Sequence, residues 1–140
     1  MKTYLYVTPF FPSPGSWRGA YCLDFIKAVV RTGRYRVEVF REGDGRDYEV
    51  GGVVVHTFRA RHLPSNVFPT LFARRNVRSF LDAVSRAGID LKDVAVCHGN
   101  TAFTIGYPPA VKAFNSHCLT IFHHHDLASF GLNNGRLRHF

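Results

Sequence analysis

Apolar residues occur along the chain in short runs and in alternation with polar residues, a pattern that predicts β-strands. The first run, TYLYVT, is rich in β-branched and aromatic residues and is predicted to be a buried strand. Gly51 and Gly52 divide the segment DYEVGGVVVHTF into two short strands of a hairpin or of a bent extension of the sheet. The predicted strands are residues 3–8, 35–41, two within 47–58, 93–100 and 118–126.

Between these strands, apolar residues recur every three or four positions, which indicates helices that bury one face. We expect a helix over residues 20–32 that ends at Gly33, and a second that begins after Pro69 and ends at Gly88. Residues 101–114 are expected to be helical in part, with their paired prolines either breaking a helix or beginning a new one. Strands that alternate with helices predict an α/β fold whose parallel sheet is covered on both faces.

Three segments with chemically active or glycine-rich residues lie at, or directly after, the carboxyl ends of predicted strands of this sheet. They are the loop 9–19 after the first strand, the segment His98-Gly99-Asn100, and the segment His123-His124-His125-Asp126. Ligands of open parallel sheets bind outside the carboxyl ends of the strands. We therefore expect these three segments, which are far apart in sequence, to meet along one edge of the sheet.

The loop after the first strand has the composition of a phosphate-binding loop without a known fingerprint. Gly15 and Gly19 allow the backbone to approach a ligand, Arg18 adds positive charge, and the helix that begins near Ala20 directs its N-terminal amides to the same place. Neither GxGxxG nor GK[ST] is present. The alternative is a proline-stiffened turn with Trp17 packed on the surface.

The consecutive histidines allow several interpretations. In a strand, His123 and His125 point to one face and His124 to the other, so His98 and these two can form a metal site, but no glutamate or cysteine has a spacing that completes it. A histidine at a strand end can instead donate a hydrogen bond or carry a proton, or it can be a structural histidine of the core or rim. Which of the three histidines faces a cleft stays open.

Composition adds charge to this picture. The 140 residues fit one domain, and their net charge of +8 favours anionic partners. Several arginines are close in sequence and form either a solvated helix face or an anion-binding surface: Arg59, Arg61, Arg74, Arg75 and Arg78. The three cysteines show no paired spacing and are expected to be buried thiols. With no long apolar run and no signal peptide, the chain is expected to be cytoplasmic.

In this order and at these distances, YLYVTPFFPSPGSWRGAY, DVAVCHGN and LTIFHHHDL resemble the N-terminal, acceptor-side domain of GT-B glycosyltransferases, most closely the retaining family 4. The separation of Gly15 from Gly19 departs from the paired glycines of that family. The resemblance implies a Rossmann-like three-layer α/β/α domain with a mostly parallel sheet over residues 1–140. It also implies that the C-terminal, donor-binding domain of the GT-B architecture is absent here.

The resemblance further implies transfer of a hexose from a nucleotide sugar to a glycan or lipid-linked acceptor, with no metal and no activity of this domain alone. It assigns catalysis to His123 and the donor-diphosphate loop to Gly15, Arg18 and Gly19. The acceptor cleft would be lined by His98, Asn100, His125 and Asp126.

Many enzymes of this kind act on lipid-linked acceptors, so the basic stretch 59–78 is a candidate for peripheral contact with the anionic inner face of a membrane. Two other function classes stay open. The charge and the aromatic residues interleaved in FARRNVRSF suit a nucleic-acid-binding domain, although no helix-turn-helix, RRM or zinc pattern is present, and no specific nucleic acid is expected. The histidines suit a metal-binding module.

Overall fold

One six-stranded sheet, in the order β3-β4-β2-β1-β5-β6, forms the centre of the computed structural model. The structure describes residues 1–64, 68 and 71–123. The strands are β1 (Thr3–Thr8), β2 (Arg36–Glu42), β3 (Tyr48–Val50), β4 (Val53–Phe58), β5 (Val94–Asn100) and β6 (Leu119–His123). All neighbouring pairs are parallel except β3 and β4, which form an antiparallel hairpin. Gly51 and Gly52 adopt φ values of 56° and 78°, as a two-residue hairpin turn requires.

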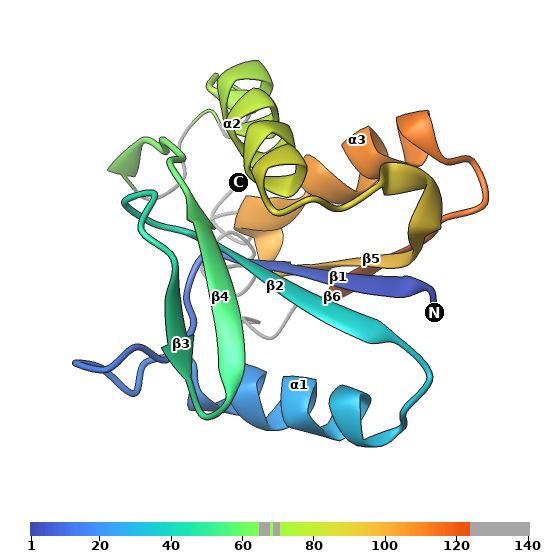
Figure 1. The fold of residues 1–140 in the computed structure, drawn as a ribbon. Coiled ribbons are helices and arrows are strands. Elements are labelled where there is room, and N and C mark those ends of the chain that lie inside the picture. Colours follow the sequence, from blue (N-terminus) through green and yellow to red (C-terminus); the bar gives the residue numbers. More distant parts are fainter. Residues whose placement is uncertain (65–67, 69–70, 124–140) are drawn as a thin grey trace, which may run out of the picture.

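Helices cover both faces of the sheet, which confirms the expected three-layer α/β/α arrangement (Figure 1). Helix α1 (Ala20–Arg31) lies on one face, and α2 (Ala73–Arg86) and α3 (Tyr107–Phe114) lie on the other. Short 3-10 turns, η2 (Leu91–Asp93) and η3 (Ala102–Thr104), flank β5. The paired prolines lie in the first turn of α3 and so begin that helix rather than break it. None of the described helices is long and apolar enough to cross a membrane.

The alternation of side chains along β1 divides the core into two layers. Leu5 and Val7 pack in the cluster on the α2 and α3 side, whereas Tyr4 and Tyr6 pack in the cluster on the α1 side. Each fully buried apolar side chain contributes about 1.5–3 kcal/mol relative to an exposed one, so this central strand anchors both layers. The three cysteines, Cys22, Cys97 and Cys118, are free and buried, as the sequence predicts.

Candidate functional site

A row of polar residues crosses the carboxyl edge of the sheet on the α1 side. Strand register pairs His123 with Asn100, Thr8 with Arg41, and Arg41 with Thr57. The row is continuous because the Asn100 side-chain amide also donates to Thr8 Oγ1 over 3.2 Å. Two residues earlier on each strand, the corresponding row is Ile121, His98, Tyr6, Val39 and Val55. The apolar layer on this side therefore ends in a line of hydrogen-bonding groups at the edge where parallel sheets bind ligands.

The structure brings two of the predicted histidines into contact at this edge. The rings of His98 and His123 stack with centroids 5.6 Å apart. His98 is only 2% exposed, and its Nδ1 lies 2.6 Å from the Tyr4 hydroxyl. Burial raises the pKa of Tyr4 to about 12, so this hydroxyl is protonated at neutral pH and donates to Nδ1. His98 is thus held by the Tyr4 hydroxyl, and its ring packs against the more accessible ring of His123.

Asn100 holds the ends of three elements together. Its side chain is fully buried, and besides Thr8 its amide contacts the Tyr21 hydroxyl at 3.3 Å and Cys22 Sγ at 3.4 Å, both in the first turn of α1. The next residue, Thr101, has φ 75° and ψ 165°, a region that costs a non-glycine residue about 1–3 kcal/mol. Its N–H donates to the His123 carbonyl over 2.7 Å, so the strained backbone links the ends of β5 and β6.

Gly15 and Gly19 of the loop 9–19 after β1, called the opening loop below, have different physical roles. Ser13 and Ser16 close a tight turn through two backbone hydrogen bonds, and a Cβ at Gly15 in this turn would meet no atom within 4 Å. Gly19 has φ +81°, and a Cβ there would lie 2.8 Å from Phe10 Cδ2. The packing of the chain itself thus requires glycine at position 19, whereas at position 15 the backbone is open to solvent.

Arg18 and the start of α1 lie beside this loop. The Arg18 guanidinium lies 5.3 Å from the centre of the Phe10 ring. Helix α1 has no side-chain cap and no acidic residue in its first turn, so no carboxylate of that turn compensates the positive end of its dipole. Trp17 is 74% exposed rather than packed on the surface.

Part of the predicted site falls beyond the described residues. The strand that contains the consecutive histidines is described as far as His123, and His124, His125 and Asp126 lie outside the described residues. Within residues 1–64, 68 and 71–123, no group of three or more His, Cys, Asp or Glu side chains is arranged to hold a metal ion.

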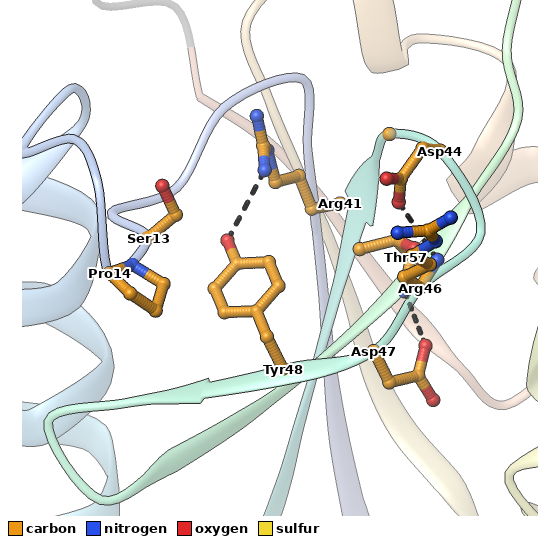
Figure 2. Close-up of a pocket in the computed structure, with 9 residues that line it drawn as sticks. Ser13, Pro14, Arg41, Asp44, Arg46, Asp47, Tyr48 and Thr57 are labelled. Atoms are coloured by element: carbon orange, nitrogen blue, oxygen red, sulfur yellow. Dashed lines mark hydrogen bonds between the residues drawn. The ribbon is translucent and has the colours of Figure 1, made fainter.

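A pocket of about 390 Å³ adjoins the row on the β2 and β4 side (Figure 2). It lies between the turn at Ser13 and Pro14 and the loop that joins β2 to β3. Its lining residues are Ser13, Pro14, Arg41, Gly43, Asp44, Arg46, Asp47, Tyr48 and Thr57. The sequence analysis did not identify Arg41 and Thr57, although each is a polar residue that lies next to the last residue of its strand.

The structure divides the basic stretch into two parts. Arg59 Nε donates to the Asp44 carbonyl over 3.2 Å, and the Arg61 guanidinium lies 5.2 Å from the centre of the Phe72 ring. The remaining arginines are exposed on α2, close in sequence to Phe68 and Leu71, two large apolar residues that are also exposed: Arg74, Arg75 and Arg78.

Comparison with known proteins supports the fold. No protein-family model and no curated protein matches the chain. Among solved structures, a sucrose-phosphate synthase chain from Thermosynechococcus elongatus matches with a TM-score of 0.53 and 15% identity, over 91% of this chain and 67% of that chain. This likeness shows that the chain shares the α/β fold of part of that protein. The expected Rossmann-like fold with a mostly parallel sheet is thereby confirmed.

Proposed function

We propose that this chain is the acceptor-side domain of a retaining glycosyltransferase, which transfers a hexose from a nucleotide sugar to a glycan or lipid-linked acceptor. The main support is that Asn100, at the end of β5, contacts the first turn of α1, while the stacked His98–His123 pair lies at the same carboxyl edge of the sheet. The shared fold agrees with this function but does not by itself establish it. In this proposal, a second Rossmann-like domain provides most of the donor site.

The arrangement assigns a different task to each part of the edge. His123 lies nearest the transferred sugar and donates a hydrogen bond that strengthens as charge develops, while buried His98 fixes the orientation of its ring. The open backbone around Gly15 and the uncompensated N-terminus of α1 face the donor diphosphate, with Arg18 as a nearby cation. Backbone amides and arginine thus neutralise the leaving group without a metal.

The histidine assignment is tested by His123→Ala in the enzyme that contains this chain, with hexose transfer and nucleoside diphosphate release as readouts. Loss of a preorganised donor at the transition state lowers turnover by on the order of 10²–10³-fold. His117→Ala is the matched control, because His117 is exposed and lies at the opposite end of β6. Wild-type turnover in a folded His123→Ala enzyme would contradict the proposal.

A further inference from the structure

The pocket between the turn at Ser13 and Pro14 and the β2–β3 loop contains a cation without an anionic partner. Arg41 is half-buried, and none of the ion pairs among the described residues includes it. Its guanidinium lies 5.9 Å from the centre of the Tyr48 ring, and Nη1 donates to the Tyr48 hydroxyl over 3.5 Å (Figure 2). Arg41 Nε is buried with no hydrogen-bond partner in the described part of the chain. A buried guanidinium N–H without an acceptor is costly, so this site is built to receive one.

A second unsatisfied group lies on the neighbouring strand. Thr57 is 1% exposed, it is the register partner of Arg41, and its Oγ1 has no hydrogen-bond partner among the residues described. Native structures satisfy nearly all buried polar groups, and a bound water or ion is one explanation of an exception. Arg41 and Thr57 thus both line the same pocket, and each has a buried polar atom without a hydrogen-bond partner among the described residues.

The acidic residues of the pocket are already engaged by the protein. Asp47 accepts from the Thr57 N–H over 2.9 Å and lies 3.1 Å from His56 Nδ1. Asp44 accepts from the Arg46 N–H over 2.9 Å. In Figure 2 both carboxylates lie on the side of the β2–β3 loop, whereas Arg41 and Tyr48 face the turn at Ser13 and Pro14. Neither carboxylate forms an ion pair with Arg41.

The pocket also suits a sugar ring. Its volume of about 390 Å³ lies in the range of small-molecule sites and accommodates one monosaccharide. The Tyr48 ring and Pro14 present apolar surface, and Ser13 presents a hydroxyl next to them. An anionic group on such a sugar would meet Arg41, and a sugar hydroxyl or a second oxygen of the anion would meet Thr57.

We propose that this pocket binds an acidic sugar, through a carboxylate or phosphate held by Arg41 and Thr57. The proposal rests on the proposed function in one respect: it identifies the bound sugar as part of the acceptor, whose reacting end then extends along the polar row toward His123. Binding itself does not depend on transfer.

The test is a titration of the isotopically labelled chain with glucuronate, glucose 6-phosphate and neutral glucose, followed by NMR. We expect the acidic sugars to shift the signals of Arg41, Tyr48 and Thr57, and glucose to bind at least tenfold more weakly. If glucuronate binds more tightly, the preferred anion is a carboxylate, and if glucose 6-phosphate binds more tightly, it is a phosphate. Equal binding of glucose, or shifts confined to the α1 N-terminus, would overturn the proposal.

Variants separate a specific site from general attraction by a basic protein. Arg41→Gln should weaken binding of the acidic sugar at least tenfold, Thr57→Val should weaken it severalfold, and Arg41→Lys should retain part of the affinity. Arg34→Gln is the matched control, because it removes the same charge from an exposed position at the amino edge of the sheet. Equal losses in Arg41→Gln and Arg34→Gln would overturn the site.

The two proposals fail in distinguishable ways. Acidic-sugar binding that depends on Arg41, together with unchanged transfer in His123→Ala, would leave the pocket assigned and refute the catalytic role. Loss of transfer in His123→Ala without any sugar binding at Arg41 would support the transferase and refute the acidic acceptor.

Discussion

The residues at the carboxyl edge of the sheet are of two kinds: some are required by the fold, and others are accessible to solvent or to a ligand. His98 and Asn100, both expected to line a cleft, are buried and position their neighbours, whereas His123 and the backbone at Gly15 are more accessible. Gly19 is required by its positive φ and by the contact with Phe10. A sequence motif alone does not distinguish these two kinds of residue.

The two glycines give the first residue-scale prediction. Gly19→Ala should lower the free energy of unfolding by about 1–3 kcal/mol, because it places a Cβ against Phe10 in a left-handed backbone conformation. Gly15→Ala should change stability by less than about 0.5 kcal/mol and yet weaken use of the nucleotide-sugar donor. Urea denaturation and donor kinetics measure the two effects. Equal destabilisation by both substitutions would contradict this distinction.

A pH prediction follows from two histidines with carboxylate partners. A hydrogen bond with Glu38, opposed by burial and assisted by Asp47, raises the pKa of His56, and a hydrogen bond with Glu42, opposed by burial, raises the pKa of His62. Raised folded-state values mean that this stabilisation is fully present below the unfolded pKa of 6.5 and is lost as pH rises through the folded pKa values.

The free energy of unfolding should therefore be lower at about pH 8.5 than at about pH 6, as measured by urea denaturation. His62→Gln should flatten this dependence, because it removes the titrating group from the 2.8 Å contact with Glu42. His117→Gln, at an exposed position, should not flatten it. A wild-type protein whose stability is constant across this range would refute the linkage.

At the scale of elements, α2 shows how one helix serves both core and surface. Its buried face places Phe80 against Phe40, Phe58 and Tyr107, with ring centroids 5.0–5.6 Å apart. Its opposite face carries the exposed arginines and no acidic residue in the first turn. The buried face explains the helical period of apolar residues in the sequence, whereas the exposed arginines take no part in the core.

We predict that this surface binds anionic membranes. Replacing Arg74, Arg75 and Arg78 by Gln should greatly reduce sedimentation with phosphatidylserine vesicles, since each basic residue near such a surface contributes about 1 kcal/mol. Added salt should weaken binding of the wild-type protein. The matched control replaces three exposed basic residues of α1 and the turn after it, Lys27, Arg31 and Arg34. Salt-independent binding, or an equal loss in the control, would contradict this surface.

At the scale of the whole molecule, the sheet order decides which segments form the site. With β1 central and flanked by β2 and β5, the loop after β1 begins between the strand that contains Arg41 and the strand that contains His98. All of these groups are at one edge because the strands concerned are parallel. The row of polar residues thus runs without a gap from the pocket to His123, across four pairs of adjacent strands.

The sequence by itself determined the alternation of strands and helices and the carboxyl ends of the first two helices, because these depend on local periodicity and on backbone conformations that glycine favours. It left two alternatives for Gly51 and Gly52, of which the structure shows the hairpin. Only the tertiary structure decided that Arg41 and Thr57 continue the row formed by Thr8 and Asn100. Strand order arises from the packing of distant segments, so no local pattern shows which polar strand ends become neighbours.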